Sequence, residues 1–63
     1  MSETQFNNLK CGDLVADDRG IAYVIIQRHC SGESMWFTGV TLDSNSYNSR
    51  ELHKSSCVFW ELV

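Results

Sequence analysis

The chain has 63 residues and a formal net charge of −3 at pH 7, which leaves room for one small domain. Its five Lys and Arg residues are scattered along the chain, so the charge balance argues against a general affinity for nucleic-acid phosphates. No apolar run approaches the roughly 20 residues that a membrane-spanning helix needs. We therefore expect neither a nucleic acid nor a membrane as the partner.

The cysteines indicate the compartment. Cys11, Cys30 and Cys57 are an odd number, whereas a small secreted scaffold usually carries an even set of paired cysteines. The first ten residues are polar and lack the apolar stretch of a signal peptide. These features predict a cytoplasmic protein with three free thiols.

The first third of the chain predicts a tail, a turn and a strand. Residues 1–8 are polar and predict a flexible N-terminal tail, which Phe6 would tack onto a domain spanning residues 9–63. Residues 11–16 read as a turn followed by a first strand. Residues 17–20 predict a tight turn, because Asp is favoured early in such turns and Gly20 supplies a positive φ.

The middle of the chain predicts two long strands. Residues 21–28 hold four β-branched residues and Tyr23, apolar in both alternations, which predicts a strand buried on both faces. A turn over residues 31–34 leads to a third strand, residues 35–42. Gly39 inside that strand predicts a bulge or bend, which a small barrel needs in order to close.

The remaining residues complete an all-β pattern. Residues 43–49 are polar and predict an exposed loop, residues 50–54 a short fourth strand, residues 55–57 a helical turn and residues 58–63 a fifth strand. Strands joined by short turns at this spacing predict an all-β fold, here a small five-stranded barrel with one short helical turn before the last strand.

This order of features resembles the SH3-like small barrels. The opening Lys10-Cys11-Gly12-Asp13-Leu14-Val15 is similar to the x-x-G-D-x-V start common in that group, and the turn with Gly20, the strand Tyr23-Val24-Ile25-Ile26, the aromatic third strand and the apolar last strand follow in matching order. Similar short chains occur among accessory proteins of bacteriophages and bacterial mobile elements. The group contains protein-binding, RNA-binding and methyl-lysine-binding members, so the resemblance implies a fold and leaves the function open.

The residue types suggest two chemical functions, a zinc site and a cysteine nucleophile. His29-Cys30 and the pair His53 and Cys57 supply zinc-type ligands, but neighbours on a strand point to opposite faces and the spacing lacks two tight ligand pairs. We expect no metal and no cofactor, and keep a zinc-stapled domain as an alternative. A cysteine–histidine nucleophile also needs an orienting group and an oxyanion donor, for which a domain this small has little room. We expect no enzymatic activity.

The aromatic residues carry the functional hypothesis. Trp36 and Phe37 are adjacent on a strand, so one of them points away from the core, and the same holds for Phe59 and Trp60. Exposed aromatics are typical interface anchors. We expect a non-enzymatic module that binds a protein partner or a second copy of itself, through the residues Trp36, Thr38, Val40, Tyr47 and Trp60.

The sequence leaves two points open. The sequence does not decide which of Trp36 and Phe37 faces the core. Single-stranded nucleic-acid binding is an alternative function, and it requires Arg28, Arg50 and Lys54 to cluster beside Trp36 or Tyr47.

Overall fold

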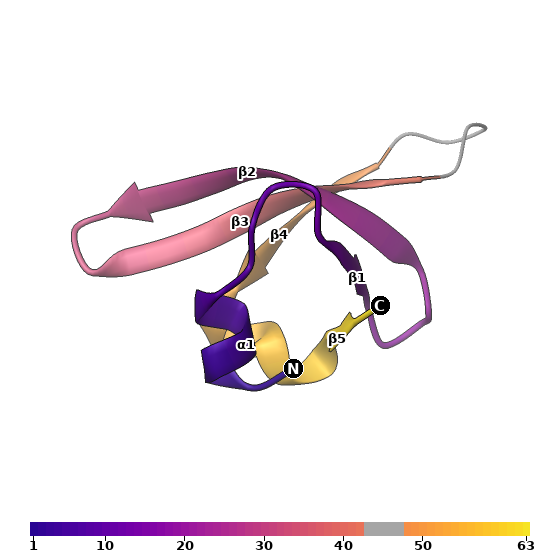
Figure 1. Ribbon diagram of the computed structural model, residues 1–63, viewed down its shortest axis with the longest axis horizontal. Coiled ribbons are helices and arrows are strands. Elements are labelled where there is room, and N and C mark those ends of the chain that lie inside the picture. The colour runs from indigo at the N-terminus through magenta and orange to yellow at the C-terminus, as the bar shows by residue number, and fades with distance from the viewer. Residues whose placement is uncertain (43–47) are drawn as a thin grey trace.

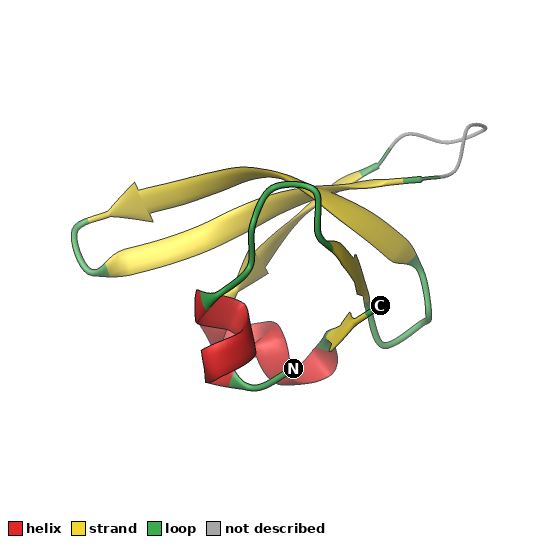
Figure 2. Cartoon of the chain, viewed as in Figure 1, coloured by secondary structure: helices red, strands yellow, loops and turns green. Residues whose placement is uncertain are grey.

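The computed structural model describes residues 1–42 and 48–63, and its five strands form one antiparallel sheet (Figures 1 and 2). The strands lie in the order β4-β3-β2-β1-β5, so the last strand returns to the side of the first. The prediction of an all-β fold with five strands is confirmed. The elements in chain order are α1 (Glu3–Asn7), β1 (Leu14–Ala16), β2 (Ala22–Ser31), β3 (Ser34–Thr41), β4 (Ser49–His53), the 3-10 helix η1 (Lys54–Phe59) and β5 (Glu61–Leu62).

The turn between β1 and β2 is organised by a buried carboxylate. The Asp17 carboxylate accepts hydrogen bonds from the backbone N–H groups of Arg19, at 3.0 Å, and Ile21, at 2.9 Å. Gly20 closes the turn at a φ of 80° and donates its N–H to the Asp17 carbonyl. The predicted turn and the predicted role of Gly20 are confirmed, because glycine adopts this left-handed conformation without steric cost.

The bulge lies on β2 and not on β3 as Gly39 had suggested. Ile25 pairs with Gly39 and Gln27 pairs with Thr38, which leaves Ile26 as the extra residue. Ile26 is exposed, so the prediction that β2 is buried on both faces is wrong. Gly39 keeps its place in the ladder for another reason: a Cβ atom there would lie 3.1 Å from the Cβ atom of Tyr23.

The N-terminal residues form helix α1 and contribute to the core, which corrects the prediction of a flexible tail over residues 1–8. A capping box begins the helix, with the Ser2 hydroxyl accepting from the Gln5 N–H and the Gln5 side chain accepting from the Ser2 N–H. Phe6 is fully buried, and its ring centroid lies 5.2 Å from that of Phe37 at an interplanar angle of 82°, an edge-to-face arrangement. The Met1 amino group donates to the carbonyls of Cys57 and Trp60.

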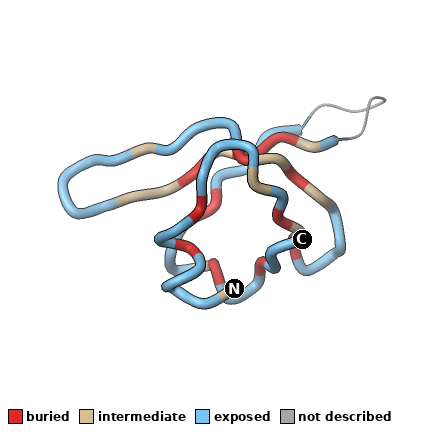
Figure 3. The backbone as a smooth tube through the Cα atoms, viewed as in Figure 1, coloured by how far each residue is buried: buried red, intermediate tan, exposed pale blue. Residues whose placement is uncertain are grey.

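The core lies between one face of the sheet and the layer formed by α1 and η1. Buried residues recur along the strands and in both helices, while the tip of the β2–β3 hairpin is exposed (Figure 3). The fifth strand is shorter than the predicted 58–63, because η1 continues through Phe59. The core consists of Phe6, Leu9, Val15, Tyr23, Ile25, Phe37, Leu52, Cys57 and Trp60.

Candidate functional site: the outer face of β3 and an adjoining pocket

Trp36 lies on the outer face of the sheet between two histidines. His29 on β2 and His53 on β4 are its direct cross-strand neighbours, so the three rings share one face. The His29 ring lies 5.2 Å from the Trp36 ring at an interplanar angle of 16°, and the His53 ring lies 5.9 Å away on the other side at 10°. We call these three side chains the ring stack.

Hydrogen bonds hold the two imidazoles of the ring stack. Nε2 of His29 shares a hydrogen bond of 2.7 Å with the Thr38 hydroxyl, and Nε2 of His53 lies 3.4 Å from a Glu51 carboxylate oxygen. Thr38 and Glu51 are themselves cross-strand neighbours, in the row next to the ring stack. The indole of Trp36 is therefore restrained on both of its faces.

The structure shows which of the neighbouring aromatics Trp36 and Phe37 faces the core. Phe37 is fully buried in the core, whereas Trp36 is half-buried on the opposite face. Thr38, also half-buried, and Val40 share that outer face by the alternation of a regular strand. Val40 is only 9% exposed and does not belong to the core cluster. It therefore offers a partner little contact area on the outer face.

Trp60 is not a surface residue, which corrects its assignment to the binding surface. It is 3% exposed, its ring lies 5.4 Å from that of Tyr23, and the Arg50 guanidinium lies 4.9 Å above it. Of the second aromatic pair the exposed member is Phe59, at 62%. Tyr47, the remaining predicted binding residue, lies outside the described residues.

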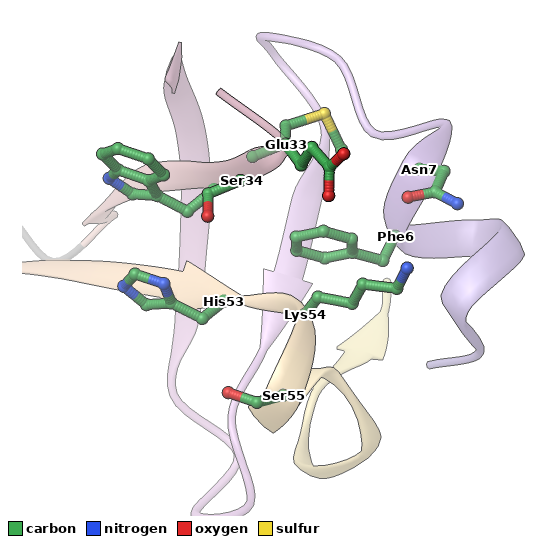
Figure 4. Close-up of a pocket in the computed structure, with 9 residues that line it drawn as sticks. Phe6, Asn7, Glu33, Ser34, His53, Lys54 and Ser55 are labelled. Carbon is green, nitrogen blue, oxygen red and sulfur yellow. The ribbon is translucent and has the colours of Figure 1, made fainter. Parts of the chain in front are cut away.

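A pocket of about 310 Å³ opens beside Trp36, where β4 ends and β3 continues alone alongside β2 (Figure 4). Its wall near the sheet is formed by Trp36, Met35 and His53, and the buried Phe6 ring reaches it from α1. The full lining is Phe6, Asn7, Glu33, Ser34, Met35, Trp36, His53, Lys54 and Ser55.

The pocket rim carries opposite charges. In Figure 4 the side chains of Glu33 and Lys54 reach it from the two sides of the Phe6 ring. Lys54 lies 4.0 Å from the carboxylate of Glu3, while Glu33 makes no ion pair with any part of the chain that is described. Sequence reasoning missed Phe6, Glu33 and Lys54 as site residues, because three segments far apart in the chain bring them together and no local pattern marks them.

The arrangement disfavours two of the alternative chemistries. Among the described residues no group of three or more His, Cys, Asp or Glu side chains could hold a metal ion, and the Trp36 indole separates the two histidines. Base stacking on Trp36 would require displacing an imidazole, because both faces of the indole are occupied.

The three cysteines are free, Cys57 buried and the other two exposed.

The cations do not cluster as single-strand binding requires. Arg28 contacts the sulfur of Met35 at 3.2 Å, and Arg50 is paired with the Asp17 carboxylate at 3.0 Å. Lys54 alone of the three lines the pocket with Trp36. A groove that tracks a phosphate backbone is therefore not formed by these three residues.

Comparisons with known proteins give no relative: no family model, no curated protein and no solved structure matches the chain. Within residues 1–42 and 48–63, no helix has the length and apolar character required to cross a bilayer.

Proposed function

We propose that the chain is a small, non-enzymatic protein-binding module with an SH3-like barrel fold. Three features support the fold: the Gly12-Asp13 opening, the short helix η1 before the last strand, and the position of β5 beside β1. Arg50 of the edge strand β4 also contacts Asp17 and Trp60, next to the opposite edge, as a closing sheet would require. We also propose that the chain is related to small bacteriophage accessory proteins and that it is located in the cytoplasm.

The observation that carries the binding function is a restrained, half-buried tryptophan at the wall of an open pocket. Trp36 is held between two imidazoles, so its indole loses little conformational freedom when a partner covers its exposed edge. Tryptophan is among the residues most enriched at energetic centres of protein interfaces. The pocket beside it offers apolar floor and polar rim, the mixture typical of such centres.

A protein is a better candidate than a nucleic acid on electrostatic grounds. The chain carries a net charge of −3, which repels phosphates and costs affinity at every contact. The pocket lining carries one carboxylate, Glu33, and one ammonium, Lys54, so it offers no excess of positive charge to a phosphate. Both faces of the Trp36 indole, on which a base would stack, are already covered.

The proposal is tested by affinity capture with matched variants. The wild-type chain, Trp36→Ala and Phe59→Ala are immobilised and exposed to a lysate of the native host; Phe59 is the control because it is an exposed aromatic on a different element. We expect Trp36→Ala to lose a protein that the wild type and Phe59→Ala both retain, with affinity at least about fivefold lower, as for loss of about 1 kcal/mol. Thermal melts of each variant report whether the fold is intact.

Two results would contradict the proposal. Retention of all captured proteins by Trp36→Ala would remove the outer face of β3 as the binding surface. Loss confined to Phe59→Ala would move the site to the exposed apolar side chains at the C-terminal end, Val58, Phe59, Leu62 and Val63. Sedimentation of the purified chain distinguishes a second copy from a foreign partner.

A further inference from the structure

The outer face of the sheet carries an apolar patch, opposite the core face on which α1 and η1 pack. Val15 and Tyr23 pair inside the core, so the residues on either side of them along β1 and β2 point outward. Ile26 follows the buried Ile25 and points away from the core as well, and it is 48% exposed. We call the apolar residues of this face the outer patch, which comprises Leu14, Ala16, Ala22, Val24, Ile26 and Val40.

No described element covers the outer patch. Leu14 pairs with Val24, and Val24 pairs with Val40, so one apolar row crosses β1, β2 and β3. Leu14 is 36% exposed and Val24 is half-buried, whereas Val40 forms the floor of the row. An antiparallel sheet with one face in water normally places polar side chains on that face. An apolar row at this position is typical of a surface that a partner covers.

The charged side chains of the strands divide between the two faces of the sheet. Arg28 and Arg50 lie on the core face, by the alternation of β2 and β4. Glu51 and Glu61 lie on the outer face, and the remaining Lys and Arg residues lie outside the strands. A Glu51 oxygen lies 3.4 Å from Nε2 of His53, and Glu61 has no ion pair with a described residue. Among the described strand residues, the outer face thus carries two carboxylates and no Lys or Arg.

The two glutamates lie on opposite sides of the outer patch. The patch spans β1, β2 and β3, whereas Glu61 belongs to β5, next to β1, and Glu51 belongs to β4, next to β3. Two strand spacings of about 4.8 Å make the patch about 10 Å wide, which is about the diameter of an α-helix. A helix lying along the strands would cover the patch with one apolar stripe and hold its two flanks above β4 and β5.

The charge on the outer face decides which occupant fits. A second copy in a face-to-face dimer would bring its own Glu51 and Glu61 against a face that offers no Lys or Arg. An anionic lipid surface would meet the same two carboxylates. Lys or Arg side chains on the flanks of a helix would neutralise them, and such complementarity favours one partner over others.

We infer that the outer patch binds an amphipathic helix of a partner protein, whose apolar stripe lies on the patch and whose flanks carry Lys or Arg beside Glu51 and Glu61. Trp36 lies on the same face, two outward-facing positions from Val40 along β3, where the same helix would reach its exposed edge. The inference rests on the proposed protein-binding function and names the chemistry of the partner.

The test selects helical peptides with charge-swapped variants. A display library has a fixed leucine stripe and randomised flanking positions. It is selected on the wild-type chain, on Glu51→Lys with Glu61→Lys, and on Glu3→Lys with Glu33→Lys, a control with the same charge change on α1 and in the β2–β3 turn. The wild type and the control should enrich Lys or Arg on the flanks, and the outer-face variant should enrich Asp or Glu.

A neutral variant guards against misfolding of the charge-swapped chain. Glu51→Gln with Glu61→Gln keeps the shape of both side chains and should lose the preference for cations without gaining one for acids. Thermal melts of every variant report whether the fold is intact.

A second measurement locates the bound peptide on the outer patch. An enriched peptide is titrated into the ¹⁵N-labelled chain, and the largest shift changes should include the amides of Val24 and Ile26. Ile26→Thr removes apolar surface from the patch and should weaken binding about fivefold, as for loss of about 1 kcal/mol. Val58→Thr, at an exposed apolar residue of η1, is the matched control and should bind as the wild type does.

The outcomes separate this inference from the proposed function. The same flanking residues selected by the wild type and the outer-face variant, no enriched peptide, or shifts centred on Phe59 would each overturn the helix inference. If Trp36-dependent capture of a protein persists in those cases, protein binding at β3 stands and only the chemistry of the partner is wrong. A dimer of the chain that Ile26→Thr dissociates would assign the outer patch to a second copy and would equally overturn the inference.

Discussion

Arg50 on β4 and Asp17, directly after β1, form an ion pair of 3.0 Å on the core side of the sheet, although 33 positions separate them in the chain. The Asp17 side chain is only 2% exposed and also holds the β1–β2 turn through the Arg19 and Ile21 N–H groups. Arg50 at the same time covers the ring of Trp60. One carboxylate thus links a local turn to the edge strand on the far side of the sheet.

The buried Asp17 carboxylate should make the stability of the fold sensitive to acid. Burial of Asp17 raises its pKa, but hydrogen bonds from the backbone of Ile21 and Arg19 and from the Arg19 side chain outweigh that effect and hold the pKa below its usual value. A lowered folded-state pKa stabilises the protein above the unfolded-state pKa, about 3.9, and that contribution is lost as pH falls through the folded-state value. Urea unfolding between pH 6 and pH 2.5 should therefore show a smaller pH dependence for Asp17→Asn than for the wild type. Asp18→Asn, at the exposed neighbour, should follow the wild type, and equal slopes for all three chains would contradict this role.

The two tryptophans should respond differently to truncation. Trp60→Ala removes a buried ring from the core and should cost about 3–5 kcal/mol, which is enough to unfold most of a domain of this size. Trp36→Ala removes a half-buried ring and two stacking contacts, for which about 1–2 kcal/mol is expected. Urea denaturation of both variants, with Trp60→Phe as a milder core variant that should stay folded, makes the comparison. A larger loss for Trp36→Ala would reverse the assignment of the two residues.

Gly39 should not tolerate a methyl group. A Cβ atom at this position would lie 3.1 Å from the Tyr23 Cβ and 3.5 Å from the Val24 carbonyl oxygen, so Gly39→Ala requires β2 and β3 to move apart. We expect a loss of about 1–3 kcal/mol in the free energy of unfolding. Ser34→Ala, at the exposed start of the same strand, should change stability by less than about 0.5 kcal/mol. A Gly39→Ala variant as stable as the wild type would show that the strands do not approach this closely.

The N-terminal helix should contribute to stability rather than fray. Phe6→Ala empties a core position between α1 and the sheet and should cost about 3–5 kcal/mol, and Phe6→Leu, which keeps an apolar side chain there, should cost less and remain folded. Thr4→Ala on the exposed side of α1 is the control. Thermal melts measure the series. Equal melting temperatures for Phe6→Leu, Thr4→Ala and the wild type would support the flexible tail that the composition predicts.

Local patterns predicted the strands well and the ends of the chain poorly. The β-branched run that begins at Ile21 and the glycine turns are short-range signals, so β2, β3 and their turns fall within a few residues of the predicted positions. Helix α1 has five residues, too few to form in isolation, and its stability comes from burying Phe6 against Phe37. A polar composition around one phenylalanine carries no sign of that distant contact.

The candidate site also has one part that local sequence patterns predicted and one part that they did not. Alternation on β3 predicts that Trp36, Thr38 and Val40 share a face, which requires only that the strand be regular. The sequence alone therefore determined an all-β chain with an aromatic strand that presents one large side chain to solvent. Only the tertiary structure decided which aromatic that is, placed two imidazoles over it, buried Trp60 and opened the pocket. Strand register and the packing of α1 against η1 decide these features, and both depend on contacts between segments that are far apart in the chain.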